Sequence, residues 1–228
     1  MSDPMIGERF GSYRLTRLIG AGSMGLVYAA THATLDYEVA VKVIRPDEVD
    51  EPLPNQRFAH EARVIAGLQH PGIVRMFDFA LRPDGRAYMV MELLRGESLS
   101  HVLRAGPLAE PRAIALARQV ADAMAAAHDH QIVHRDLKPG NIFVVAEPAI
   151  GRGERAKVLD FGIAKRARHT AQFPLASDEV IGTPAYMSPE QCSPGHVVDA
   201  RSDIYSFGAT LYHVVTGAAP FGRQSATR

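Results

Sequence analysis

The sequence predicts an α+β protein in which a strand-rich first part, residues 1–94, precedes a mainly helical second part, residues 95–228. Residues 13–19 alternate apolar and polar side chains, and residues 39–44 are rich in β-branched residues, as strands are. From residue 110 to residue 130, apolar side chains instead recur every three or four positions, which is typical of an amphipathic helix. The change of period therefore predicts two small lobes of different structure.

The composition is that of a globular protein without a charge bias. Of 228 residues, 46% are hydrophobic and 22% are charged, which is enough to bury a core and too apolar for a disordered chain. The 25 basic residues balance the 25 acidic ones, which argues against a general nucleic-acid binder. Cys192 is the single cysteine, no apolar stretch reaches the roughly 18 residues of a membrane span, and no secretory signal is evident. We therefore expect a cytoplasmic protein with no nucleic-acid partner and no membrane segment.

Each expected element follows from its local pattern. Strands are expected at residues 13–19, 39–44, 88–94, 142–145 and 156–159, and helices at residues 57–68, 110–130 and 203–216. The segment Arg95-Gly96-Glu97 is expected to form a hinge. The buried stripe of the second helix is expected to consist of Ile114, Ala117, Val120 and Met124. The last helix is apolar nearly all round, and we expect it to be buried on every side.

Residues 20–25, Gly-Ala-Gly-Ser-Met-Gly, form a glycine cluster after the first strand. Glycines let a backbone approach phosphate oxygens and donate N–H groups to them. The pattern also fits a dinucleotide-binding turn, with Asp47 as its later acidic residue, or a tight structural turn. A dinucleotide fold would bury residues 39–44 on both faces, where Lys42 would be costly. The phosphate-covering loop and the plain turn both stay open on this motif alone.

Lys42 and Glu61 are charged residues on otherwise apolar faces of their elements. A buried charge costs free energy unless an opposite charge pairs with it, so each supplies the partner that the other needs. The alternative is that both side chains extend to the solvent, which is common for lysine and less so for an inward glutamate.

Residues 134–141, His-Arg-Asp-Leu-Lys-Pro-Gly-Asn, bring an imidazole, a carboxylate, two cations and an amide together. Apolar residues on both sides of this segment predict a rigid, half-buried loop, and fixed polar groups on such a loop indicate a functional site. An exposed charged turn is the alternative. Asp160-Phe161-Gly162 follows the strand expected at 156–159, so Asp160 can present a carboxylate to a cation.

The order of these motifs resembles that of eukaryotic-type (Hanks-type) bacterial serine/threonine protein kinases, from Gly20 to Gly217. In this family, residues 182–190 end the activation segment and residues 199–203 open a buried helix. The resemblance implies a bilobal protein-kinase-like fold. It would have a small antiparallel sheet with helix C in the N-lobe and a mainly helical C-lobe that lacks its last helices.

The resemblance also implies ATP and Mg²⁺ as cofactors and gives the motif residues their roles. The nucleotide would contact Gly20, Ala21, Gly22, Ser23, Gly25, Val27, Ala40, Lys42, Met91, Glu92, Leu94 and Phe143, with Met91 as gatekeeper. Lys42, oriented by Glu61, would hold the α- and β-phosphates. Asn141 and Asp160 would bind Mg²⁺, a cation that prefers oxygen ligands.

The same resemblance predicts the acceptor chemistry. Asp136 would orient the substrate hydroxyl, Lys138 would neutralise the migrating phosphoryl group, and Thr183 would bridge these two residues. Lysine at position 138 and Thr183 both imply serine and threonine acceptors in protein substrates. The candidate sites of autophosphorylation in the activation segment are Ser177 and, less favoured, Thr170. The alternative is that each is an ordinary polar residue of a surface loop.

The sequence departs from the family pattern in three places. Gly140 and the sequence Ser188-Pro189-Glu190 are mild variants. Only twelve residues follow the helix at 203–216, so the helices that would cover it, and an arginine to pair with Glu190, are expected to come from a missing C-terminal segment or a partner. The alternative function is therefore a weakly active or inactive nucleotide-binding regulatory module. A small-molecule kinase ranks lower, because such relatives generally lack a segment like residues 182–190.

Overall fold

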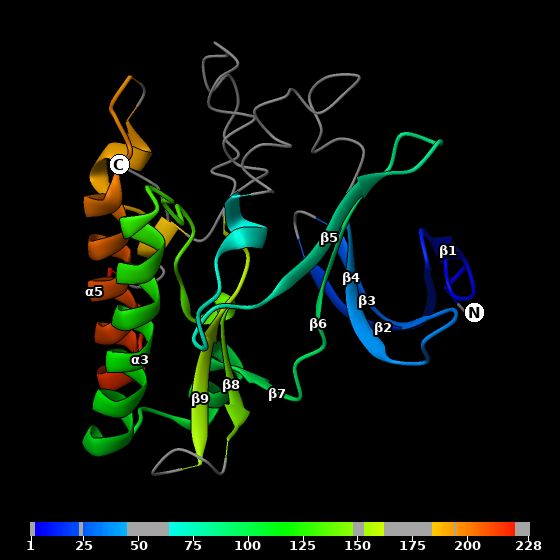
Figure 1. Ribbon diagram of the computed structural model, residues 1–228. Helices are drawn as coiled ribbons and strands as arrows, with labels where there is room; N and C mark the ends of the chain where they lie inside the picture. The colour runs from blue at the N-terminus through cyan, green and yellow to red at the C-terminus, as the bar shows by residue number, and fades with distance from the viewer. Residues whose placement is uncertain are drawn as a thin grey trace. The chain divides into compact units, whose positions relative to one another are not determined.

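The computed structural model describes residues 3–22, 25–44, 64–147, 153–161, 184–193 and 195–221 (Figure 1). These residues fall into two compact units. The first includes Met1–Gln69 and Val74–Leu94, and the second includes His70–Ile73 and most of the chain from Arg95 onward. The first unit is built on an antiparallel sheet and the second contains the long helices, which confirms the predicted α+β class.

The first unit contains a six-stranded sheet in which every pairing is antiparallel. Its strands are β1 (Arg9–Phe10), β2 (Tyr13–Gly22), β3 (Gly25–His32), β4 (Glu38–Ile44), β5 (Met76–Leu81) and β6 (Ala87–Glu92), in the spatial order β1-β2-β3-β4-β6-β5. Residues 64–67 are helical, within the helix expected at 57–68. Three of these strands were predicted, although β2 runs further than expected and β6 ends two residues earlier. The strands β1, β3 and β5 were missed.

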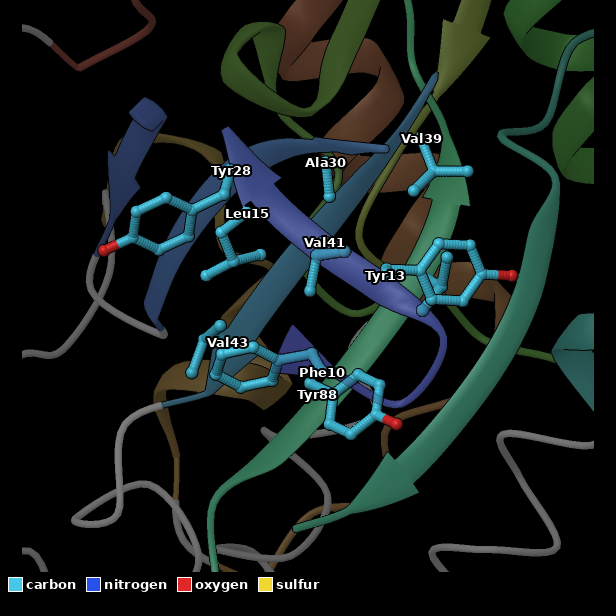
Figure 2. Close-up of a cluster of buried hydrophobic side chains, with 10 residues drawn as sticks. Phe10, Tyr13, Leu15, Tyr28, Ala30, Val39, Val41, Val43 and Tyr88 are labelled. Carbon is cyan, nitrogen blue, oxygen red and sulfur yellow. The ribbon is translucent and has the colours of Figure 1, made fainter. Parts of the chain in front are cut away.

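One face of this sheet carries an apolar core (Figure 2). Strand pairing aligns Val41 with Tyr28 on β3 and with Val90 on β6, so these side chains share a face. Phe10 on β1 packs edge-on against Tyr88, with 5.3 Å between the ring centroids. The whole cluster consists of Phe10, Tyr13, Leu15, Tyr28, Ala30, Val39, Val41, Val43, Tyr88 and Val90. The alternation of β4 therefore leaves Lys42 on the opposite face.

The second unit combines a small sheet with helices. Its elements are β7 (Gly96–Ser98), β8 (Ile142–Ala146), β9 (Glu154–Val158), α2 (Leu99–Val102), α3 (Glu110–Asp129) and α5 (Ala200–Thr216), with short 3-10 helices that include η5 (Pro189–Cys192). The sheet has the order β7-β8-β9, and α3 packs against both β9 and α5. The strands predicted at 142–145 and 156–159 are confirmed within one or two residues at each end.

The predicted hinge at residues 95–97 is partly wrong. Gly96 and Glu97 belong to β7 and pair with Val145 and Val144 of β8, so the unpaired connection is residues 93–95 instead. A Cβ at position 96 would overlap the backbone carbonyl of Val144. Glycine is therefore present at this position for a close approach of two strands rather than for flexibility.

Two helices depart from the expected burial, α3 in part and α5 more fully. On α3, Val120 and Met124 are buried as predicted, but Ile114 is 51% exposed. The buried residues of α3 are Ala113, Leu116, Val120, Ala123, Met124 and Ala127. On α5, Ile204 is 63% exposed and Val215 is 51% exposed, so the expectation of burial on every side is wrong. Its buried face is instead mostly polar and contains Ser202, Asp203, Ser206, Ala209, Thr210 and Val214.

Candidate active site

Lys42 lies on the sheet face opposite the apolar core and is only 6% exposed. It pairs across the sheet with Val27 on β3 and Met89 on β6, and two positions earlier Ala40 pairs with Met91. Directly opposed residues point to the same side of an antiparallel sheet. The predicted nucleotide contacts Val27, Ala40, Lys42 and Met91 therefore share one surface of the first unit.

The glycine cluster forms the closed end of the β2–β3 hairpin. Gly20 pairs with Val27, and Gly22 pairs with Gly25. A Cβ at Gly25 would collide with the backbone carbonyl of Val43, so this glycine allows the close approach of β3 to β4. Ala21 and Gly22 are exposed, which leaves their backbone accessible to an anion. Ser23 lies outside the described residues.

The end of β6 is fixed by hydrogen bonds to Arg75. The Glu92 amide donates to the Arg75 carbonyl over 2.9 Å, and the Arg75 amide donates to the Glu92 carboxylate over 2.8 Å. Leu94, in the connection after β6, is half-buried. Phe143 belongs to the second unit, where it is half-buried on β8 and pairs with Ser98 and Lys157.

In the second unit, His134 is fully buried at the start of the catalytic loop, the name used here for residues 134–141. Burial lowers the pKa of His134 below its usual value, although nearby Asp203 and the Leu159 carbonyl act in the opposite direction. In the neutral ring, Nε2 donates to the Leu159 carbonyl over 2.7 Å and Nδ1 accepts the Asp136 amide over 3.2 Å. The ring also packs on Phe161 at 4.8 Å between centroids.

The Asp136 carboxylate contacts two other side chains of the catalytic loop, those of Lys138 and Asn141. The Lys138 ammonium is 3.0 Å from one carboxylate oxygen of Asp136 and 3.2 Å from the other. The Asn141 side-chain nitrogen donates to the Asp136 carbonyl over 2.8 Å and to its carboxylate over 3.1 Å. The side-chain nitrogen of Asn141 makes these hydrogen bonds. The side-chain oxygen of Asn141 is therefore the atom suited to bind a hard cation.

Asp160 follows β9 in a left-handed backbone conformation, with a φ of 55°. The Leu159 amide just before it donates to the Asn141 carbonyl over 2.8 Å. This bond joins the segment after β9 to the catalytic loop. The two predicted magnesium ligands therefore lie just outside two paired strands, Asn141 directly before β8 and Asp160 shortly after β9. An amide oxygen and a carboxylate are a donor set that fits Mg²⁺.

Asp203, which the sequence did not single out as a functional residue, accepts hydrogen bonds from the backbone of the catalytic loop. Its carboxylate is 1% exposed and accepts the His134 amide over 2.7 Å and the Arg135 amide over 2.8 Å. The His128 ring on α3 adds a third hydrogen bond over 2.9 Å. An aspartate inside a nearly apolar helix was the available signal, because a buried carboxylate needs several donors.

Residues 184–193 are anchored on α5. The Ser206 hydroxyl donates to the Tyr186 carbonyl over 2.8 Å, and the Tyr186 hydroxyl lies 2.6 Å from the His213 ring. The Ser202 hydroxyl donates to Glu190, a bond that lowers the pKa of this carboxyl. Four other predicted site residues, Glu61, Thr170, Ser177 and Thr183, lie outside the described residues.

The comparisons with known proteins agree with this arrangement of motifs. The family model of the protein kinase domain matches residues 13–228. The serine/threonine-protein kinases pkn2 and Pkn1 of Myxococcus xanthus are 43% and 44% identical over 92% and 96% of the chain. The chain spans only 25% and 31% of the length of these two relatives.

Solved structures give the same result at the level of the fold. The PknI kinase domain of Mycobacterium tuberculosis superposes with a TM-score of 0.76 at 28% identity. The match covers 98% of this chain and 82% of that domain. The chain therefore belongs to the protein kinase family, among the bacterial serine/threonine kinases.

Proposed function

We propose that this chain transfers the γ-phosphoryl group of ATP to serine and threonine hydroxyls of proteins. The single observation that carries the proposal is the arrangement around Asp136, whose carboxylate is held by Lys138 and Asn141 on a half-buried loop. Phosphoryl transfer depends mainly on positioning and charge neutralisation, and this arrangement supplies both.

In this proposal, residues of each unit hold one part of the nucleotide. Bound ATP would supply the phosphoryl group, and Mg²⁺ would neutralise part of the negative charge of its phosphates. In the first unit, the backbone of residues 20–25 covers the phosphates and Lys42, oriented by Glu61, binds two of them. In the second unit, the Asn141 oxygen and the Asp160 carboxylate hold the cation.

Asp136 accepts a hydrogen bond from the acceptor hydroxyl and directs its oxygen toward the phosphorus. Lys138, only 3.0 Å from Asp136, places a positive charge where the transferred group passes. The pair Lys138 and Thr183 favours serine and threonine over tyrosine. We also propose Ser177 as the main site of autophosphorylation and Thr170 as a second site.

We further propose residues 1–94 as the ATP-binding lobe and residues 95–228 as the catalytic lobe of a cytoplasmic signalling protein. Its partners would be ATP and protein substrates rather than nucleic acids. Among the described residues, no helix combines the length and the apolar character that crossing a bilayer requires.

A second candidate function rests on the exposed apolar face of α5, which includes Ile204, Tyr212 and Val215. A further segment of chain or a partner protein would cover this face and complete the C-lobe. Without that cover, the chain would be a regulatory module that binds nucleotide and transfers phosphate weakly or not at all.

Incubation with Mg·ATP, followed by intact-mass measurement and phosphopeptide mapping, tests the proposal. We expect mass increments of one or more phosphates in the wild type, at Ser177 or Thr170, and none in Asp136→Asn. A folded wild type that binds ATP and gains no mass, alone or with an added acceptor protein, would instead support the regulatory module.

A further inference from the structure

We propose that Gln191 is a positioning residue for the catalytic loop, because its side chain fixes the peptide group that joins Arg135 to Asp136. Gln191 directly follows the sequence Ser188-Pro189-Glu190. This inference rests on the proposed phosphoryl transfer, since it concerns how Asp136 is held toward its acceptor.

Local structure determines which end of the Gln191 amide faces the catalytic loop. Ser188 is fully buried and caps the short helix η5. Its backbone amide donates to Gln191 Oε1 over 3.1 Å, and its hydroxyl donates to the same oxygen over 3.3 Å. With the oxygen engaged by two donors, the nitrogen must be at the other end of the side chain. It donates to the Arg135 carbonyl over 2.7 Å.

The bond from Gln191 acts on a peptide group that needs support. Arg135 has a φ of 63°, a left-handed conformation that is unfavourable for a residue with a Cβ. Its carbonyl and the Asp136 amide belong to the same peptide group. Gln191 holds the carbonyl end, and His134 Nδ1 accepts the amide end over 3.2 Å. The orientation of this peptide group sets the position of the Asp136 Cα atom, and hence of its carboxylate.

The bond also closes a ring of contacts between three segments. Asp203 on α5 accepts the Arg135 amide, and its neighbour Ser202 donates to Glu190, the residue before Gln191. The ring therefore runs from α5 to the catalytic loop, from the loop to Gln191, and back to α5. A shift of residues 184–193 would act directly on the Arg135 carbonyl through the Gln191 side chain.

Gln119 on α3 offers a matched control. Its oxygen accepts the Ala156 amide over 2.9 Å, and its nitrogen donates to the Glu154 carbonyl over 3.3 Å. This side chain therefore bridges two backbone groups in the same way as Gln191. It joins α3 to β9 and makes no hydrogen bond to residues 134–141 within the described part of the chain.

Steady-state kinetics of Gln191→Glu and Gln119→Glu with a serine peptide test the proposal. Glutamate keeps an oxygen for Ser188 and replaces the donor with an acceptor that repels the Arg135 carbonyl. We expect Gln191→Glu to lower kcat about 10- to 100-fold with the KM for ATP within about twofold of wild type, and Gln119→Glu to keep kcat within about twofold. Equal losses of kcat in the two variants, or an unchanged kcat in Gln191→Glu, would overturn the inference.

Amide hydrogen exchange gives a second readout that does not depend on turnover. In the wild type, we expect slow exchange of the Gln191 side-chain protons and of the Ser188 amide. In Gln191→Glu, the Asp136 amide should exchange at least about tenfold faster, whereas in Gln119→Glu it should not. Side-chain protons of Gln191 that exchange at the rate of an exposed amide would refute the positioning role. A wild type that binds ATP without transferring phosphate would refute the proposed function alone.

Discussion

At the scale of single residues, the catalytic loop is held by polar groups that are themselves buried. His134 and Asp203 are 0% and 1% exposed, and together they make hydrogen bonds to the amides of His134, Arg135 and Asp136. Hydrogen bonds to a buried carboxylate are stronger than neutral ones, and they leave unpaired donors when the carboxylate is removed. The precision of the Asp136 position therefore depends on residues that would touch no substrate.

Asp203→Asn should lower kcat without abolishing folding. The asparagine side chain has a single acceptor oxygen, so it can accept only one of the two backbone N–H groups that the Asp203 carboxylate binds. The loss of a charge-assisted hydrogen bond costs about 1.5–3 kcal/mol. A comparable loss in the transition state corresponds to about a 10- to 100-fold decrease in kcat. Phosphoryl-transfer assays check this prediction.

Asp199→Asn is the control for this substitution, because Asp199 caps the same helix from an exposed position and pairs with Arg201. Its kcat should stay within about twofold of wild type. If Asp203→Asn is as active as Asp199→Asn, the support of the catalytic loop does not depend on the buried carboxylate.

The contribution of the sequence at this scale was uneven. The spacing of Asp136, Lys138 and Asn141 predicted a site, and the structure brings these three side chains together. The roles of Asp203 and Gln191 depend on contacts with residues 135 and 188. The order of residues in a sequence indicates burial and secondary structure. It does not indicate which distant backbone groups will hydrogen-bond to a carboxylate or a glutamine side chain, so these roles required the structure.

At the scale of elements, the N-terminal segment is part of the sheet core rather than an appendage. Phe10 on β1 is fully buried, and the Arg82 guanidinium lies 4.4 Å from its ring centroid. Glu8 forms ion pairs with Arg82 and Arg86 on the β5–β6 hairpin. This segment lies before residue 13, where the match to the kinase family model begins.

Phe10→Ala should destabilise the first unit by about 3–5 kcal/mol, since a large buried aromatic side chain is lost from a packed core. Phe77→Ala is the matched control, because Phe77 on β5 also lies near an arginine but is 43% exposed. Its cost should stay below about 1 kcal/mol. Urea unfolding of both variants measures the difference, and equal costs would mean that Phe10 is not a core residue.

The hydroxyl of Tyr28 on β3 makes the stability of the first unit sensitive to alkaline pH. Burial, followed by the hydrogen bond to Asp3, raises the pKa of Tyr28 to about 12 from the usual 10.0. A raised tyrosine pKa stabilises the fold below pH 10, and this contribution is lost as the pH rises toward 12. Between these values the free energy of unfolding should fall by about 1.4 kcal/mol per pH unit for this residue.

Tyr28→Phe removes this titration, so its unfolding free energy should decrease less steeply between pH 10 and 12 than that of the wild type. Tyr212→Phe, at a 51% exposed position on α5, should keep the wild-type slope. Denaturant unfolding at several pH values checks the prediction. Identical slopes for Tyr28→Phe and wild type would show that Tyr28 ionises normally in the folded protein.

The sequence predicted elements with a clear period better than the others, and length alone did not decide the outcome, because the eight-residue strand β3 was missed. Strands with β-branched runs, such as β4, and the long helix α3 have a clear period and were found. Strands β1 and β7, of two and three residues, are too short to show any period, and their structure comes from pairing with β2 and β8. Tertiary contacts also decide which face a helix buries, as Ile114 shows.

At the scale of the whole molecule, α5 carries an exposed apolar face within the described part of the chain. Ile204, Tyr212 and Val215 are each more than half exposed, while Val214 beside them is 5% exposed. Contiguous exposed apolar side chains commonly mark a surface that contacts another protein segment. Substitutions on this face and on the buried face should therefore behave differently.

The double substitution Ile204→Ser and Val215→Ser should change the free energy of unfolding by less than about 1 kcal/mol, because exposed positions contribute little. It should also reduce binding of a dye that detects exposed apolar surface. Val214→Ala, at the buried position, should cost about 1–3 kcal/mol. A large loss of stability in the double variant would mean that this face is already covered in the isolated chain.

In the proposed function, the half-buried loop around Asp136 directs serine and threonine hydroxyls to the phosphate of ATP. The most direct test measures transfer of labelled γ-phosphate to three peptides that differ only in a serine, threonine or tyrosine acceptor, with wild type and Asp136→Asn. We expect transfer to serine and threonine, little to tyrosine, and a loss of about a thousandfold or more in Asp136→Asn. Equal transfer by the variant, or no transfer by a wild type that binds Mg·ATP, would contradict this account.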